Sequence, residues 1–180
     1  AGNVNGYSSL LSAVSAMPVS ITICWLLTAV LPAISPRGFR LGESAGAFYV
    51  AMLAVLTLLL IVHLMLLHSA MTQAMPSLGL LVASIGALFI VLGMLVARAK
   101  KNFWFGVRTP WTLASDEVWR RSNHFGGRLM VAGGIIAVLA SFFSNARMPV
   151  LVAIIAVIAF APILYSYAVY RRIEGFDSEA

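Results

Sequence analysis

Five apolar runs, each long enough to cross a bilayer, constrain the fold of this 180-residue chain more than any other feature. A spanning helix needs about 20 apolar residues, and a segment surrounded by lipid must satisfy its own backbone, which selects helices. Only 10% of the residues are charged, too few to cover a soluble domain of this length. The sequence therefore predicts an all-α, polytopic transmembrane helix bundle with spans at Leu10–Ile34, Ala45–His68, Leu78–Ala97, Gly127–Ser144 and Met148–Tyr170.

These runs divide the chain into four parts. Residues 1–97 form a three-span membrane part, and residues 98–128 form one long polar loop. Residues 129–170 form a two-span membrane part, followed by a tail at 171–180. The long loop is the only extended polar stretch, so we expect it to carry the function.

The placement of Lys and Arg predicts the orientation in the membrane. If successive connections alternate sides, eleven of the twelve basic residues fall on one side and only Arg147 falls on the other. Cytoplasmic loops retain positive charges. The loop 98–128 and the C-terminus are therefore predicted to be cytoplasmic, and Ala1 is predicted to be extracytoplasmic. This topology accounts for the net charge of +6 without a nucleic-acid partner.

Glycines at seven-residue spacing mark the third and fourth spans as a packed pair. The pairs are Gly86/Gly93, Gly126/Gly133 and Gly127/Gly134. A spacing of seven returns to nearly the same face of a helix, and small residues let helix backbones approach closely in lipid. We therefore expect these two spans to pack tightly on either side of the long loop.

The first part of the loop contains two residues that restrict its backbone. Gly106 permits a turn next to the aromatic cluster Phe103–Phe105. Pro110 biases Thr109 toward an extended conformation. An ordered loop is therefore expected here.

The second part of the loop predicts a short amphipathic helix. Ser115 is a good N-cap, and the next two residues, Asp116 and Glu117, complement the positive end of a helix dipole. Gly126 either ends this helix or joins it to the fourth span. We expect the helix to lie along the inner membrane surface.

Enzyme and transport chemistry have little support in the residues. All six acids lie in loops or the tail, so no buried carboxylate is available for proton coupling. No catalytic set, phosphate loop or paired metal motif occurs, and we predict a non-enzyme without a cofactor. His63 and His68, with Met65, Met71 and Met75 nearby, could hold Cu(I). Met is a normal apolar filler, so we favour no metal site.

The loop resembles the signature of the SdpI family, whose members are bacterial integral membrane proteins. The matching strings are Asn102–Leu113 (NFWFGVRTPWTL), Glu117–Arg120 (EVWR) and His124–Gly127 (HFGG). Asn123 departs from the usual Thr at its position. The similarity extends weakly to Leu31–Pro36 and Tyr165–Arg171.

The resemblance implies further features. The full protein would have six spans, with one helix upstream of Ala1, in the bacterial inner membrane. Family members give immunity against a membrane-active peptide toxin and can hold a transcriptional repressor at the membrane. Expected partners are therefore the bilayer, a toxin or a repressor, and homo-oligomers are compatible with the sequence.

The expected site is the signature loop. Arg108 is its first candidate, as a planar donor for a phosphate, a lipid headgroup, a partner carboxylate or a backbone carbonyl of the loop. It could instead be a loop-folding residue paired with Asp116 or Glu117. We interpret Trp111 and Trp119 as anchors at the membrane interface. His124 either titrates or caps a helix. The candidate set is Asn102, Gly106, Arg108, Thr109, Pro110, Trp111, Trp119, Arg120, His124 and Gly127.

Two other functions stay open at this point. The chain could be an accessory structural subunit of a larger membrane complex, because it is small and its helix faces are rich in glycine. A small-molecule or ion carrier needs a polar pathway, which the spans mostly lack.

Overall fold

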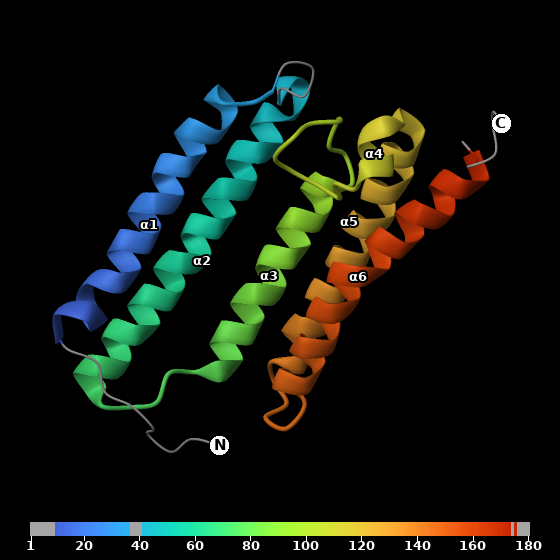
Figure 1. Cartoon of the computed structure of the whole chain (residues 1–180). Coiled ribbons are helices and arrows are strands. Elements are labelled where there is room, and N and C mark those ends of the chain that lie inside the picture. Colours follow the sequence, from blue (N-terminus) through green and yellow to red (C-terminus); the bar gives the residue numbers. More distant parts are fainter. Residues whose placement is uncertain (1–9, 37–40, 174, 176–180) are drawn as a thin grey trace.

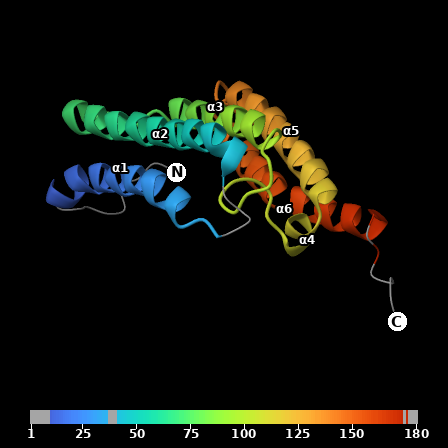
Figure 2. The same cartoon turned by 90° about the horizontal axis from the view of Figure 1, so that it is seen from above.

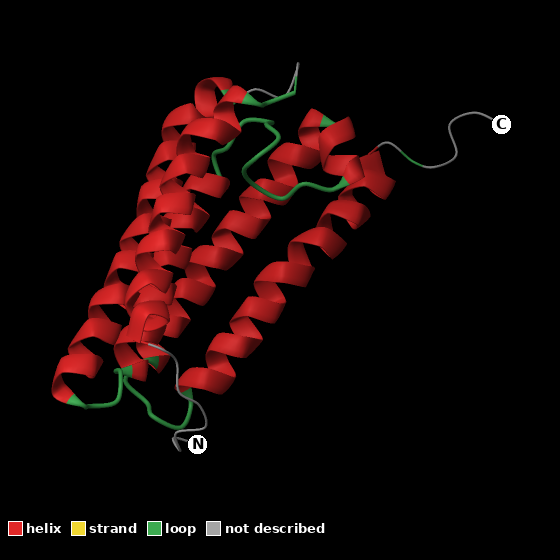
Figure 3. Cartoon of the chain, turned by 60° about the vertical axis from the view of Figure 1, so that its left-hand side comes forward, coloured by secondary structure: helices red, strands yellow, loops and turns green. Residues whose placement is uncertain are grey.

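The structure, a computed structural model, describes residues 10–36, 41–173 and 175. Within these ranges it contains helices and loops only (Figure 3). In this described part of the chain, five helices are long and apolar enough to cross a membrane, which confirms an all-α, multi-pass membrane protein. The elements are α1 (Leu10–Ala33), the short 3-10 helix η1 (Gly42–Ser44), α2 (Ala45–Thr72), α3 (Leu78–Val96), α4 (Pro110–Ala114), α5 (Asp116–Ala140) and α6 (Arg147–Ile173).

Each long helix packs against the next long helix in the chain. Helices α2, α3 and α5 lie side by side in a row (Figure 1). The connection that contains α4 lies at the upper ends of these helices in that view. Helix α1 packs on α2 and α6 packs on α5, and both lie on the same side of the row (Figure 2). The most extensive contact joins α3 to α5, and the next joins α5 to α6.

The glycine pattern explains the close contact between α3 and α5. These helices run antiparallel, and Gly86 faces Gly134 while Gly93 faces Gly127. A Cβ atom added to Gly93 would lie 2.5 Å from the carbonyl oxygen of Gly127, which leaves no room for any side chain. The predicted tight pairing of the third and fourth spans is confirmed.

The other two glycines of the repeat serve a different helix. A Cβ atom on Gly133 would lie 2.8 Å from Ile154 of α6, and one on Gly126 would lie 3.3 Å from Pro162 of α6. Helix α5 therefore has small residues on two faces, one for α3 and one for α6. This arrangement makes α5 the central helix of the C-terminal half.

The prediction of a separate interfacial helix after Ser115 is wrong. Helix α5 runs from Asp116 to Ala140 without a break, so the predicted span boundary at Gly127 lies inside it. Gly126 joins the two parts rather than ending the first, because its bare face packs against α6. Ser115 does occupy the N-cap position, but its side chain makes no capping hydrogen bond.

The short helix of the third connection is α4 instead. It begins at Pro110, whose missing N–H costs nothing in the first turn of a helix. Thr109 before it is extended, as predicted, with φ −120° and ψ 161°. The predicted location of Ala1 and the basic residues Arg37 and Arg40 fall outside the described residues.

Candidate functional site

Asn102 organises the start of the signature loop. Its side chain is fully buried, and its Oδ1 accepts hydrogen bonds from the backbone N–H groups of Trp104 at 2.9 Å and Phe105 at 2.8 Å. Its Nδ2 donates to the carbonyl oxygens of Lys100 at 2.9 Å and Phe105 at 3.1 Å. One side chain thus makes four hydrogen bonds to the backbone of three residues, and its own hydrogen-bonding capacity is used in full.

The loop then turns at Gly106 and docks on α5. Gly106 has φ +111°, a conformation that favours glycine. The next residue, Val107, donates its N–H to Oδ1 of Asn123 at 2.7 Å. Asn123 Nδ2 donates in turn to the carbonyl oxygen of Trp119 at 3.0 Å. A side chain on Gly106 would collide with Asn123, so the turn and the helix fit only as a pair.

Helix α4 attaches the loop to α6. Thr109 and Thr112 form a reciprocal capping box, in which each hydroxyl accepts a hydrogen bond from the other residue's N–H, at 3.2 and 2.8 Å. Trp111 Nε1 donates to Ser166 Oγ of α6 at 2.6 Å, and the Trp111 ring meets Tyr167 edge-on. Ser166 is fully buried in the C-terminal half of α6. This contact therefore holds α4 against that half of the helix.

Two further hydrogen bonds attach the loop to the N-terminal helices. Trp104 Nε1 donates to Ser35 Oγ, just beyond the end of α1, at 2.7 Å. Lys100 N donates to Ser44 Oγ, at the start of α2, at 2.8 Å. The signature loop therefore contacts the ends of α1 and α2 as well as α5 and α6, and it closes this end of the bundle (Figure 1).

Trp119 fastens α5 to the end of α3. Its side chain is only 3% exposed, and its Nε1 donates to the carbonyl oxygen of Ala99 at 2.8 Å. The prediction that Trp119 is an anchor at the membrane interface is wrong, because its ring packs inside the protein. Trp111 is half-buried, and its indole N–H is taken by Ser166 rather than by the membrane interface.

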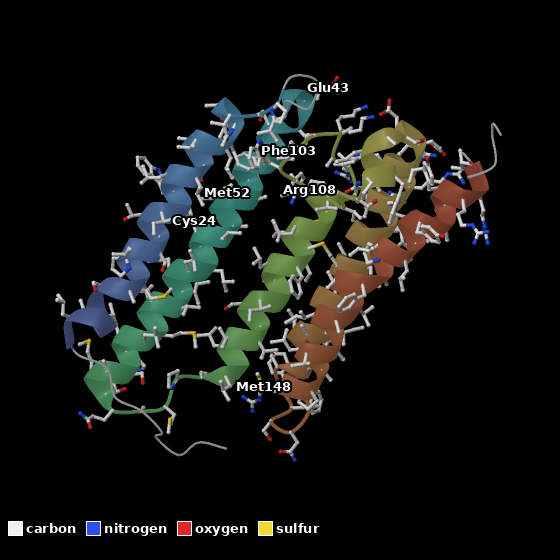
Figure 4. The ribbon with its side chains drawn as sticks, in the orientation of Figure 1. Cys24, Glu43, Met52, Phe103, Arg108 and Met148 are labelled. Carbon is white, nitrogen blue, oxygen red and sulfur yellow. The ribbon has the colours of Figure 1, made fainter. Side chains whose placement is uncertain are left out.

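Arg108 is an exposed basic residue in the first part of the folded loop. Its Nη1 donates to the carbonyl oxygen of Phe103, and the two residues lie together at the loop end of the bundle (Figure 4). The predicted pairing with Asp116 or Glu117 is wrong, because other basic residues hold both acids. Arg108 borders a groove of about 370 Å³ under the loop, lined also by Val96, Met130, Ile158 and Ile163.

The acids at the start of α5 are neutralised locally. Asp116 pairs with Lys101 at 2.5 Å, while Glu117 accepts from Arg120 at 2.7 Å and Arg121 at 2.6 Å. These first turns of α5 stand beside the loop, beyond the apolar part of the helix. Hydrogen bonds from Arg120 and then Arg121 lower the pKa of the Glu117 carboxyl to about 2.

The ten predicted site residues separate into three groups. Six build the folded loop, namely Asn102, Gly106, Thr109, Pro110, Trp111 and Trp119. Gly127 belongs to the contact between α3 and α5. Arg108, Arg120 and His124 are exposed, and they do not share one groove.

Sequence reasoning missed the residues outside the loop that accept hydrogen bonds from it. Ser35, Ser44 and Ser166 each bond a loop residue that is 55 or more positions away in the chain. Asn123, noted only as a departure from the family pattern, is 1% exposed and holds both the loop turn and α5. The weakly matching stretches around Ser35 and Ser166 carried a signal, because small polar residues there interrupt apolar runs.

The histidines of α2 lie apart from this loop. His63 is half-buried and His68 is exposed near the other end of the helix. Within the described ranges, no three His, Cys, Asp or Glu side chains gather in a way that could hold a metal ion.

Comparisons with known proteins address the loop and the helices that follow it. Residues 98–166 match the model of the SdpI/YfhL protein family. Over this segment the chain is therefore similar to the SdpI/YfhL family. It is also 30% identical over 92 residues to the protein named Immunity protein SdpI from Bacillus subtilis (strain 168).

That alignment covers 51% of this chain and 44% of the Bacillus protein, so the chain spans less than half the length of its curated relative. No solved structure shows a significant match. The segment that matches the family model begins at Arg98 and ends at Ser166. Ser166 accepts the hydrogen bond from the Trp111 indole N–H. The SdpI/YfhL segment therefore comprises the folded loop, α4, α5 and most of α6.

Proposed function

We propose that this chain belongs to the SdpI/YfhL family and is a non-enzymatic immunity protein that protects its cell from a membrane-active peptide toxin. The observation that carries the proposal is Arg108 at the edge of a groove under a fully folded signature loop. The relative named as an immunity protein supports the same class of function.

The loop supplies a fixed position for Arg108. Its backbone is held by Asn102 and Asn123, and α4 is held by Ser166. Arg108 uses Nη1 for Phe103 and forms no ion pair in the described part of the chain. Its remaining N–H groups are therefore available to the carbonyl or carboxylate oxygens of a toxin that enters from the membrane.

The groove next to Arg108 suits a peptide that is partly apolar. Its lining includes Met130, Ile158 and Ile163, whose side chains have no hydrogen-bond donor and, apart from the weakly accepting Met sulfur, no acceptor. An apolar segment of the toxin would pack against these side chains while Arg108 bonds its polar end. We infer from the positive-inside rule that the loop faces the cytoplasm, in the inner membrane of a bacterium. A repressor held by the exposed loop would then be a second partner on the same side.

The test uses cells of the source organism with the gene deleted. We expect them to be killed by the secreted peptide fraction of their own culture and to be rescued by the wild-type gene. Rescue should fail with Arg108→Gln and succeed with Arg172→Gln, a matched loss of one exposed positive charge in the last turn of α6. Equal membrane levels of the variants, measured by immunoblot, make the comparison valid. Full rescue by Arg108→Gln would reject the site, and deletion without sensitivity would reject the function.

The alternative function, an accessory subunit of a larger membrane complex, makes a different prediction. Purification in mild detergent should then bring down a second protein in fixed ratio. A lone monomer or a homodimer in the same experiment would favour immunity.

A further inference from the structure

A second groove, separate from the one beside Arg108, lies between α3 and α5. It has a volume of about 440 Å³ and shares no lining residue with the Arg108 groove. Its floor is the close crossing of Gly93 and Gly127, where neither helix has a side chain. The two helix backbones touch at this crossing, and the groove follows the contact near the loop end of the helices.

The basic groove, as we name this second groove, has two chemically different halves. Arg98, His124 and Arg128 border it at the loop end. One turn or more deeper it is bordered by Met94, Val131 and Ile135, and Met94 and Ile135 are 50% and 47% exposed on the lipid-facing surface. A ligand that fits both halves must carry an anionic group at one end and an apolar chain at the other.

Among the described residues, no acid forms an ion pair with the basic half of the groove. The side chains of Arg98, His124 and Arg128 make no hydrogen bond or ion pair with any described residue. The acids nearest in sequence, Asp116 and Glu117, are already bonded to Lys101, Arg120 and Arg121. The third described acid, Glu43, borders a neighbouring groove together with Arg98 and Lys100, and no ion pair joins them.

The positions of Arg98 and Arg128 match the level of the lipid headgroups. Arg98 follows the end of α3 at Val96 by two residues, and Arg128 directly precedes the apolar run that begins at Leu129 in α5. Arg at helix ends extends its guanidinium toward the headgroups, and basic pockets between helices on this side of a membrane bind phospholipid head groups. Ordinary helix-end arginines are spread around a bundle, whereas here two of them and a histidine converge on one groove.

We propose that the basic groove binds one anionic phospholipid. Its phosphodiester lies between Arg98 and Arg128, with His124 beside it, and one acyl chain follows Val131 and Ile135 toward the membrane centre. A free phosphate would fill only the basic half, and an acidic peptide would leave the apolar half facing lipid. The site is independent of the Arg108 groove, and a bound lipid would join α3 to α5 at the end that supports the signature loop.

The test measures lipid selectivity on the purified full chain in mixed micelles that contain equal amounts of phosphatidylglycerol and phosphatidylcholine. Native mass spectrometry should show retention of phosphatidylglycerol in preference to phosphatidylcholine. The double variant Arg98→Gln/Arg128→Gln should reduce that preference by about tenfold or more, from the loss of two charge-assisted contacts. The matched control Arg171→Gln/Arg172→Gln removes the same charge from the last turn of α6 and should change it by less than about twofold.

A second variant tests the apolar half and does not touch the charges. Ala132 is exposed and borders the groove, so Ala132→Phe places a ring where the acyl chain would lie. It should reduce retention of long-chain phosphatidylglycerol and leave retention of a short-chain form unchanged. Equal loss from both double variants, equal retention of phosphatidylcholine, or full thermal stabilisation by inorganic phosphate alone would overturn the proposal.

Discussion

The two halves of this protein use apolar helices in different ways. In the N-terminal pair of helices, α1 and α2, almost no residue of the apolar segments is buried inside the protein. The buried share of these residues is 0% in α1 and 6% in α2. In the C-terminal half, the share in α5 is 39%. All these helices are apolar enough to span a membrane, so apolarity places a helix in lipid but does not pack it against a neighbour.

Small residues and buried polar side chains make the difference. Helix α5 offers Gly126, Gly127, Gly133 and Gly134 to its neighbours, while α1 contains no glycine and α2 contains only Gly46, in its first turn. The family segment at 98–166 lies in the tightly packed half. The segment that matches the family model thus lies where the helices pack closest and tolerate larger side chains least.

The contact between α3 and α5 is where a substitution should cost most. Gly127→Leu would force a side chain against the carbonyl oxygen of Gly93, which a Cβ atom alone would approach to 2.5 Å. We expect a loss of about 3 kcal/mol or more in the free energy of unfolding. Thermal unfolding in detergent measures it.

The matched control is Gly46→Ala in α2, where an added Cβ atom would meet nothing within 4 Å. This variant should keep the wild-type unfolding temperature or raise it slightly, because Ala is the better helix former. Equal destabilisation by the two substitutions would remove the distinction between the halves.

The second largest effect is expected inside the loop. Asn102→Ala leaves the buried N–H of Phe105 and the N–H of Trp104 without an acceptor, which should cost about 2 to 4 kcal/mol. Circular dichroism and limited proteolysis should show intact helices and a new cleavage site near Gly106. A loop that resists cleavage in this variant would show that Asn102 does not hold it.

A smaller effect is expected where the loop reaches the N-terminal pair. Trp104→Phe keeps the ring and removes the donor to Ser35, one hydrogen bond worth about 1 kcal/mol. Spin labels on α1 and on the loop should show a broader distance distribution. As a control, Ser20→Ala deletes a hydroxyl that bonds only within α1, to Ala16, and should leave the distribution unchanged.

The smallest effect is expected at the exposed ion pairs of α5. The pKa of Glu117 is about 2 in the folded protein, below its ordinary value of 4.5. Its pairing with Arg120 and Arg121 therefore stabilises the fold fully above about pH 4.5, and this contribution disappears as the pH falls toward 2. Unfolding temperatures of wild type and Glu117→Gln should converge across that range, with only a small difference above it because the pair is exposed. A constant difference at all pH values would contradict the assignment.

The sequence alone predicted the helices well and their partners poorly. Long apolar runs and seven-residue glycine spacing report local geometry, which is why the five spans and the pairing of α3 with α5 were predictable. The continuity of α5 was not, because two adjacent glycines can equally end a helix or give it two bare faces. Tertiary contact with Gly93 and Pro162 decides between these outcomes.

The residues that hold the loop were beyond sequence reasoning for a related reason. Trp104 and Ser35 are 69 positions apart, and Trp111 and Ser166 are 55 apart. Ser35 and Ser166 also donate to backbone carbonyl oxygens of α1 and α6, as Ser15 does in α1, so nothing local marks them as acceptors for the loop. Only the packing of the helices brings each donor to its acceptor.

The most direct test of the central claim is amide hydrogen exchange on the protein in lipid nanodiscs. The claim is that the signature loop is a folded element, bonded internally by Asn102 and to α5 by Asn123. The N–H groups of Phe105 and Val107 should then exchange about as slowly as those in the middle of α3. Exchange of both at the rate of an exposed connection, such as Met75, would contradict it.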